Sequence, residues 1–162
     1  DLVSVSGSYS NGPLYMGMAF ESLGNYTGMD AATAFRLGGS WTFASATTLA
    51  GIWESADKGG TNGDRDAWYV SVAHKMGGHT LKAAVAGAGE MGGVADTGAV
   101  QYSLGIAHEL SKSTEMYALY TVVDNNANGT YGVWSGSQTI AGFANESVSS
   151  LSVGVNHKFS SK

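Results

Sequence analysis

Seven charged side chains occupy one side of segments whose residues alternate between polar and apolar types. In an extended strand successive side chains point to opposite faces, so these charges project from one face into water. On the wall of a water-filled passage such charges set ion preference. On an ordinary solvated sheet they would do no chemistry. The residues predicted to line a pore are Glu21, Arg36, Glu54, Lys75, Lys82, Glu109 and Lys158.

The other reactive residues do not combine into a catalytic or metal centre. His74 and His79 flank the turn at 76–78, but two imidazoles without a carboxylate make a weak metal site. The 124–129 stretch resembles a calcium loop, yet Ser135 stands where the closing acidic ligand belongs. Cysteine is absent, which excludes thiol catalysis and thiolate metal sites. We therefore predict a protein that is not an enzyme and uses no metal and no cofactor.

The composition of the 162-residue chain favours β structure and excludes several function classes. Its 24 glycines would each cost a helix interior about 1 kcal/mol, and Val, Thr, Tyr and Trp dominate the segments between them. No apolar run is long enough for a transmembrane helix. The 8 Lys and Arg residues form no basic patch, and the net charge is −5, so nucleic-acid binding is not expected.

Nine alternating segments predict nine strands. Most have about ten residues, which is long for a globular strand and matches a tilted membrane-spanning strand of about 9–11 residues. The predicted strands cover residues 2–9, 13–22, 33–43, 47–55, 66–75, 79–87, 99–109, 114–123 and 149–159.

Short turns and long loops separate these strands in strict alternation, as in a barrel with tight periplasmic turns and longer outer loops. The turns at 10–12, 44–46, 76–78 and 110–113 are predicted to be periplasmic. The loops at 23–32, 56–65, 88–98 and 124–147 are predicted to face outward. Aromatic residues near strand ends predict two interfacial girdles. They are Tyr9, Tyr15, Phe20, Phe43, Trp53, Trp68, Tyr69, Tyr117 and Phe159.

The last strand shows the clearest alternation. Leu151, Val153, Val155 and Phe159 share one face, and small polar or charged residues occupy the other. This pattern favours an all-β, antiparallel, up-and-down transmembrane β-barrel. It also fits a soluble or surface β-barrel or sandwich that binds a ligand or a partner, and the alternation alone leaves both open.

Three phrases carry a resemblance to a known family. They are NGPLYMG at 11–17, LSKSTEMYALYT at 110–121 and LSVGVNHKF at 151–159. Together they resemble the general-diffusion outer-membrane porins of the β-proteobacterial (Neisseria and Comamonas) type. The middle phrase is the most specific, because a turn and both flanking strands match together.

The resemblance implies a sixteen-stranded, water-filled barrel, usually trimeric, for passive diffusion of ions and small hydrophilic solutes. Residues 1–162 would then be a single barrel segment of about nine strands, the C-terminal half of such a porin. An odd set of up-and-down strands cannot close on itself, and open edges in lipid cost several kcal/mol per unpaired group. Other copies or another chain would have to complete the barrel.

The implied location is the bacterial outer membrane. The implied partners are the lipid bilayer and lipopolysaccharide, further copies in a homotrimer, the N-terminal half of the barrel and the barrel-assembly machinery. That machinery would read the closing strand as an assembly signal carried by Leu151, Val153, Val155 and Phe159. The tail at 160–162 departs from the family, which ends at or near the aromatic residue.

Overall fold

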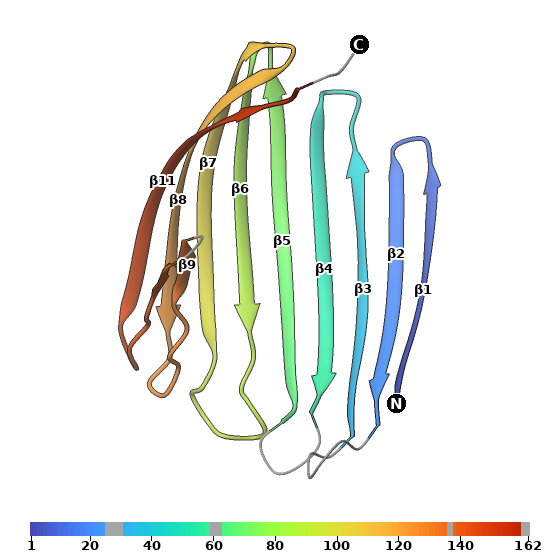
Figure 1. Cartoon of the computed structure of the whole chain (residues 1–162), viewed down its shortest axis with the longest axis vertical. Helices are drawn as coiled ribbons and strands as arrows, with labels where there is room; N and C mark the ends of the chain where they lie inside the picture. Colours follow the sequence, from blue (N-terminus) through green and yellow to red (C-terminus); the bar gives the residue numbers. More distant parts are fainter. Residues whose placement is uncertain (25–30, 59–62, 136–137, 160–162) are drawn as a thin grey trace.

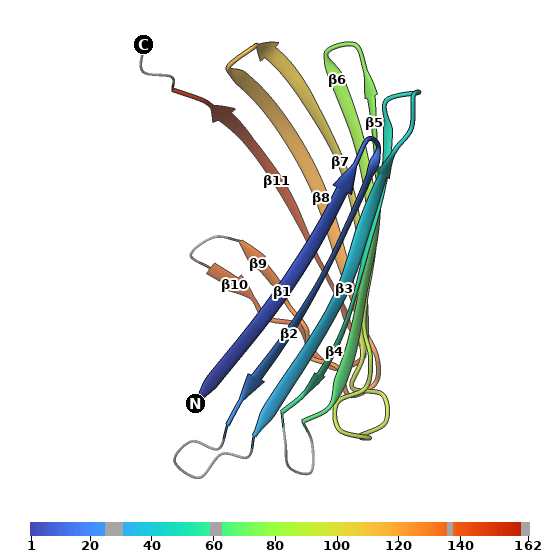
Figure 2. The same ribbon diagram turned by 90° about the vertical axis from the view of Figure 1, so that its right-hand side faces the viewer.

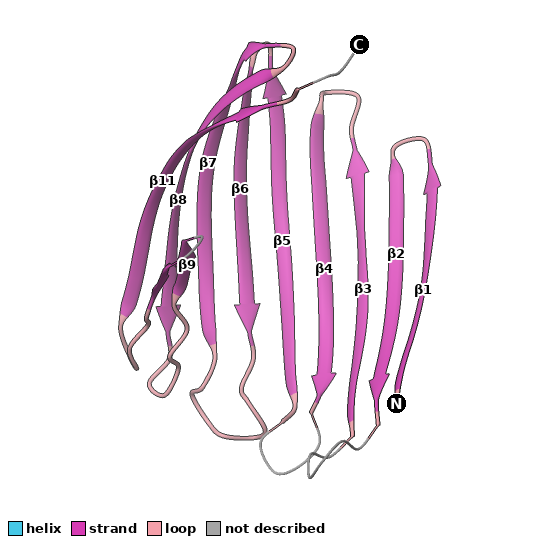
Figure 3. Cartoon of the chain, in the orientation of Figure 1, coloured by secondary structure: helices cyan, strands magenta, loops and turns pink. Residues whose placement is uncertain are grey.

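The computed structural model describes the chain except for residues 25–30, 59–62, 136–137 and 160–162. Nine long strands form one sheet in which each pairs antiparallel with its neighbour along the chain, in the order β1-β2-β3-β4-β5-β6-β7-β8-β11 (Figures 1 and 3). Among the described residues, no helix is long and apolar enough to cross a membrane.

The strands of the large sheet are 10 to 13 residues long. At about 3.3 Å per residue and a tilt of about 40°, they would cross about 25–33 Å, the thickness of a bilayer core. They are β1 (Leu2–Asn11), β2 (Leu14–Leu23), β3 (Ala32–Thr42), β4 (Thr47–Asp57), β5 (Arg65–Met76), β6 (His79–Ala88), β7 (Ala99–Ser111), β8 (Thr114–Asn125) and β11 (Ser147–His157).

Tight turns connect the strands at one end of the sheet, and longer connections lie at the other end (Figure 1). Gly12 and Gly77 adopt positive φ values of 56° and 58°, which a residue without a Cβ reaches at little cost. The predicted alternation of short turns and longer connections along the chain is therefore confirmed.

One part of the prediction was incomplete. The segment at 124–147 was predicted as a loop, but β8 continues to Asn125 and two short strands follow, β9 (Val133–Ser135) and β10 (Gln138–Ile140). These two pair with each other as a separate antiparallel hairpin. Strands of three residues are too short to show a recognisable period of two.

Among the described residues, nothing covers the large sheet as a second layer except the short β9–β10 hairpin over part of its concave side. The buried hydrophobic residues among those described are Ala99, Ala107, Val123 and Val133 only, whereas Leu104 in the middle of β7 is 65% exposed. A sandwich would bury one face of each of two sheets. The soluble sandwich is therefore the wrong alternative, and the all-β up-and-down architecture is confirmed.

The sheet is curved and open. Figure 2 shows it as a bent wall with β9 and β10 on its concave side. The two outermost strands, β1 and β11, each pair on one side only, so their other edges carry unpaired backbone N–H and C=O groups.

Candidate functional site

The concave face carries the charges singled out in the sequence. Register pairs Arg36 on β3 with Glu54 on β4, and the guanidinium Nε donates a hydrogen bond to the Glu54 carboxylate. Glu21 on β2 shares this face, because its pairing partner Ala34 lies two residues from Arg36. Six of the seven predicted residues thus lie within strands on the concave side, and Lys158 follows the end of β11.

A second ion pair joins strands that are not adjacent. Lys75 Nζ on β5 lies 2.6 Å from Glu109 Oε1 on β7, so the pair reaches across β6. The two side chains are 50% and 47% exposed. Hydrated pairs of this kind are worth about 0–1 kcal/mol, so their main effect is on the local electric field rather than on stability.

Lys82 has a different environment. No carboxylate lies within salt-bridge distance of Lys82 in the part of the chain that the structure describes. It borders a hollow of 570 Å³ whose lining is rich in hydroxyl groups, among them Ser103 and Thr121, whose oxygens are 3.2 Å apart. An ammonium group among hydroxyls, with no carboxylate beside it, makes this part of the wall locally positive.

Glu115 was missed in the sequence. It pairs with Glu109 across β7 and β8 and therefore lies on the concave face beside a like charge. The alternation of the predicted strand 114–123 could have identified it, because Glu115 has the opposite parity to Met116, Ala118 and Tyr120, which form an apolar face. Lys158 donates its backbone N–H to Ser113 O at 2.8 Å, which holds the chain after β11 against the neighbouring turn.

Three tyrosines predicted for the girdles lie on the concave face instead. Tyr15 and Tyr69 line a second hollow of 620 Å³ together with Arg36. Tyr117 lies over its cross-strand partner Gly154, where an added Cβ would be 2.6 Å from the phenol oxygen. Their position near strand ends suggested the girdles. Which face of the sheet a side chain occupies depends on the alternation along the strand, however, and the alternation places these rings on the concave face.

The other face of the sheet is apolar and has aromatic rims. Near the loop end, Phe35 and Trp53 are ring neighbours at 6.2 Å, and Trp53 pairs with Trp68. Near the turn end, Trp41 and Phe43 are 6.5 Å apart. Amphipathic rings favour the headgroup level of a bilayer, so two rims separated by an apolar band match a membrane-spanning outer face.

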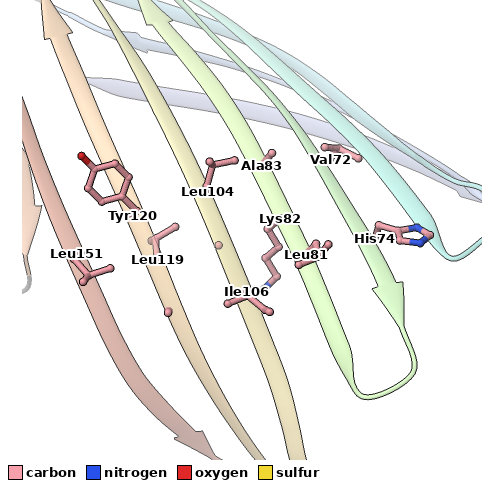
Figure 4. Close-up of a pocket in the computed structure, with 12 residues that line it drawn as sticks. Val72, His74, Leu81, Lys82, Ala83, Leu104, Ile106, Leu119, Tyr120 and Leu151 are labelled. Atoms are coloured by element: carbon pink, nitrogen blue, oxygen red, sulfur yellow. The ribbon is translucent and has the colours of Figure 1, made fainter.

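A hollow of 470 Å³ lies on this outer face (Figure 4). Leu81, Leu104, Ile106 and Leu151 contribute large side chains, while Ala83 is small and leaves the space between them. Its lining is almost entirely apolar. His74 and Lys82 also border the hollow, but apolar side chains dominate its lining, which therefore suits an acyl chain better than a hydrophilic solute.

His74 and His79, which flank the turn at 76–78, have separate partners in the structure. His79 stacks on His108 of β7 with ring centroids 4.4 Å apart, and His74 Nδ1 lies 2.8 Å from Thr47 Oγ1. These partners are set by the register of the paired strands and not by closeness in sequence. In the described ranges no group of three or more His, Cys, Asp or Glu residues is placed to hold a metal ion.

At the loop end of the sheet, side chains connect separate loops. Arg65 Nη1 donates to Tyr131 Oη at 3.3 Å and lies over its ring at 5.9 Å from the centroid. Nearby, a hydrogen bond and the negative charge of Asp57 raise the pKa of the Asp64 carboxyl. Neither contact could be predicted from the sequence, because Asp64 and Tyr131 lie in connecting segments without a periodic pattern.

The closing strand presents the residues predicted as an assembly signal. Leu151, Val153 and Val155 are exposed on the outer face of β11 at 71%, 74% and 63%. Phe159 is 91% exposed, and its ring packs edge-on against His157 at 4.5 Å. The strand therefore offers both an unpaired edge and an apolar face.

Long antiparallel strands in simple succession, an apolar outer face with aromatic rims and a charged concave face together define the wall of a membrane β-barrel. The family model described as Gram-negative porin matches residues 1–128. The chain belongs to this family, which assigns it to the bacterial outer membrane.

The solved structures similar to the chain include two porins. The anion-selective porin from Comamonas acidovorans matches with a TM-score of 0.85 and 24% identity, over 98% of this chain and 49% of that one. A porin refined at 1.8 Å resolution matches with a TM-score of 0.63 and 16% identity, over 98% and 51%. The chain thus spans about half the length of the porins it matches. A search of curated proteins found no match.

Proposed function

We propose that this chain builds about half the wall of a water-filled outer-membrane channel through which ions and small hydrophilic solutes diffuse passively. The separation of the two faces supports this most directly. Leu104 is 65% exposed on the apolar face, and the adjacent Ser103 lies among hydroxyl groups on the concave face. A barrel wall between hydrocarbon and water requires this division at every strand.

The proposed barrel is completed by strands outside residues 1–162. The unpaired edges of β1 and β11 would each leave a row of unsatisfied backbone groups in lipid, at several kcal/mol per group. The matched porins are about twice as long as this chain. Residues 1–162 are then a single barrel segment, the C-terminal part of a porin whose N-terminal half supplies the remaining strands.

Within this channel the charges of the concave face line the pore. Both signs are present, and two of the pairs are close enough to compensate each other locally. They keep the wall hydrated and shape the field that a passing ion meets. The proposed pore-lining residues are Glu21, Arg36, Glu54, Lys75, Lys82, Glu109 and Lys158.

The proposed partners follow from the outer surface. The bilayer covers the apolar face, with acyl chains in the hollow beside Leu104, and lipopolysaccharide meets the rim near Trp53 and Trp68. The barrel-assembly machinery engages β11 through Leu151 and its neighbours on the outer face. We also propose a homotrimer, the assembly usual for porins.

Planar bilayers test the proposed channel. The complete barrel containing this chain should produce stepwise, ohmic increases in conductance when added to one side. The same protein after heat unfolding is the control and should produce none. Bilayers that stay tight with folded protein would contradict the proposal. Native mass spectrometry in detergent tests the trimer, which a purely monomeric mass would exclude.

A further inference from the structure

All four histidines of the chain lie on the outer face of the sheet, close to its turn end. Alternation places them there, because they have the parity of Leu104 or Val155 on their own strand or on a paired one. Each lies at most four residues from a tight turn, or pairs with a residue that does. Trp41 of the aromatic rim lies three residues before its own turn, so the imidazoles share the level of that rim. They are His74, His79, His108 and His157.

Two of these imidazoles are held by hydroxyl groups and two are not. His74 and His157 each place Nδ1 2.8 Å from a threonine hydroxyl. His79 and His108, here called the histidine pair, stack on each other instead, with ring centroids 4.4 Å apart. Within the described part of the chain neither ring has a hydrogen-bond partner, and His108 Nδ1 is buried. Polar groups at such positions normally have a partner, so the pair calls for an acceptor from outside the chain.

A groove leads from the histidine pair into the apolar band of the outer face. The pair borders a hollow of 440 Å³, and the 470 Å³ hollow beside Leu104 adjoins it. Ile106 and Ala118 border both hollows, so the two form one continuous depression, here called the outer groove. Ala118 pairs with Ile106 on β7 and with Val153 on β11, and its small side chain leaves a gap between these larger ones. Figure 4 shows the part beside Leu104.

The outer groove has the length and the polarity of one lipid acyl chain. Between His108 and Leu104 it follows four residues of β7, about 13 Å at about 3.3 Å per residue. The hydrocarbon of one leaflet is about 15 Å thick, half of a bilayer core. A bound peptide would leave its backbone N–H and C=O groups unpaired against this apolar lining, whereas an acyl chain has no polar group to satisfy.

The end of the groove at the histidine pair suits a phosphate group. An imidazole N–H donates hydrogen bonds, and the ring can also carry a positive charge, which an adjacent anion favours. The carboxylate of Glu109, the next residue after His108, lies on the concave face and is bound to Lys75. The turn end is predicted to be periplasmic, and the lipids of that leaflet carry a phosphodiester at this depth.

We propose that the outer groove binds one phospholipid of the periplasmic leaflet, with its phosphate at His79 and His108 and one acyl chain along Ile106 and Ala118 toward Leu104. This inference rests on the part of the proposed function in which the bilayer covers the outer face, and it does not depend on conduction. The bound chain fills a depression whose walls would otherwise lack contact atoms. The second acyl chain of the lipid stays among the surrounding lipids.

The first arm of the test varies the lipid. The complete barrel containing this chain is titrated in detergent with phosphatidylglycerol, or with a diacylglycerol that has the same acyl chains and no phosphate. Native mass spectrometry counts the lipids that stay bound. The wild type should bind phosphatidylglycerol about tenfold more tightly than diacylglycerol, as expected for one or two added hydrogen bonds. Inorganic phosphate should not compete, and competition would show an anion site without a lipid.

The second arm varies the protein. Replacing both His79 and His108 by Phe keeps two stacked rings but removes the nitrogens, so the preference for phosphatidylglycerol should disappear. His157→Phe makes the same change at the same level outside the outer groove and should keep the preference. Ala118→Phe fills the gap in the groove and should weaken both lipids on the order of tenfold. Val70→Phe is its control, because Val70 lies on the outer face of β5 and does not border the groove.

Gel mobility without heating shows which variants are folded. An equal affinity of the wild type for both lipids, or an unchanged preference in the double Phe variant, would overturn the phosphate site. Equal lipid binding by Ala118→Phe and Val70→Phe would overturn the groove. If Ala118→Phe lost an oligomeric mass and kept its lipids, the groove would belong to a neighbouring copy instead. If the double variant does not fold, the comparison of lipids on the wild type and the pair of variants at 118 and 70 still decide.

Conductance in planar bilayers separates this site from the proposed channel. All folded variants should conduct like the wild type, because the substituted side chains lie on the outer face. A wild type that binds the phospholipid and does not conduct would refute the channel and leave the lipid site intact. A wild type that conducts without any preference for phosphatidylglycerol would do the reverse.

Discussion

The separation of the two faces makes one sharp prediction at two adjacent positions of β7. Leu104 has Ala83 and Tyr120 as its cross-strand neighbours and is 65% exposed on the outer face. It lies five residues from Ala99, about 13 Å below the loop end of the strand at a tilt of about 40°. An arginine at position 104 would therefore meet hydrocarbon and could reach neither water nor a carboxylate.

The expected cost of Leu104→Arg is about 2–4 kcal/mol, the value for a cation at the midplane of a barrel's lipid face. This corresponds to a roughly 30- to 700-fold loss in the folding equilibrium constant. Ser103→Arg is the matched control, with the same new charge one residue away. The substitution removes the hydroxyl contact between Ser103 and Thr121, which is worth about 0.5–1.5 kcal/mol. The new side chain can extend into the 570 Å³ hollow.

Urea titration of the complete barrel in phospholipid vesicles, followed by tryptophan fluorescence and by gel mobility without heating, measures both costs. Leu104→Arg should move the midpoint far below that of the wild type, and Ser103→Arg should remain close to it. In planar bilayers Ser103→Arg should shift the reversal potential toward anions. Equal destabilisation by both substitutions would mean that β7 is covered on both faces, and the barrel interpretation would then be refuted.

Three further expectations concern assembly, topology and packing. Phe159→Ala removes the 91% exposed ring at the end of the closing strand and should reduce the outer-membrane fraction measured by cell fractionation; unchanged assembly would argue against the signal. Trypsin added to intact cells should cleave at Lys58 in a long loop and spare Lys112 in a short turn, and the reverse pattern would invert the topology. Gly154→Val should destabilise the barrel by about 1–3 kcal/mol through collision with Tyr117, and Tyr117→Ala should restore part of that stability in urea titration.

The sequence alone determined the features that repeat every two residues. Alternation separated Leu104 from Ser103, set the length of the strands and directed the charges to one face, because side-chain direction in a strand depends only on position. The tight turns predicted at 10–12 and 76–78 have an equally local basis, since Gly12 and Gly77 adopt positive φ, which is nearly free for glycine.

Tertiary structure decided which residues meet. The Lys75–Glu109 pair crosses a whole strand, and His79 stacks on His108 rather than meeting His74. The inward hairpin was not foreseeable, because Asn125, Val133 and Tyr131 lie in a segment without period, and their contacts exist only once β7, β8 and β11 form the wall beneath them. Such contacts depend on the register of several strands together and on the close approach of two backbones. Neither can be read from one segment of the sequence.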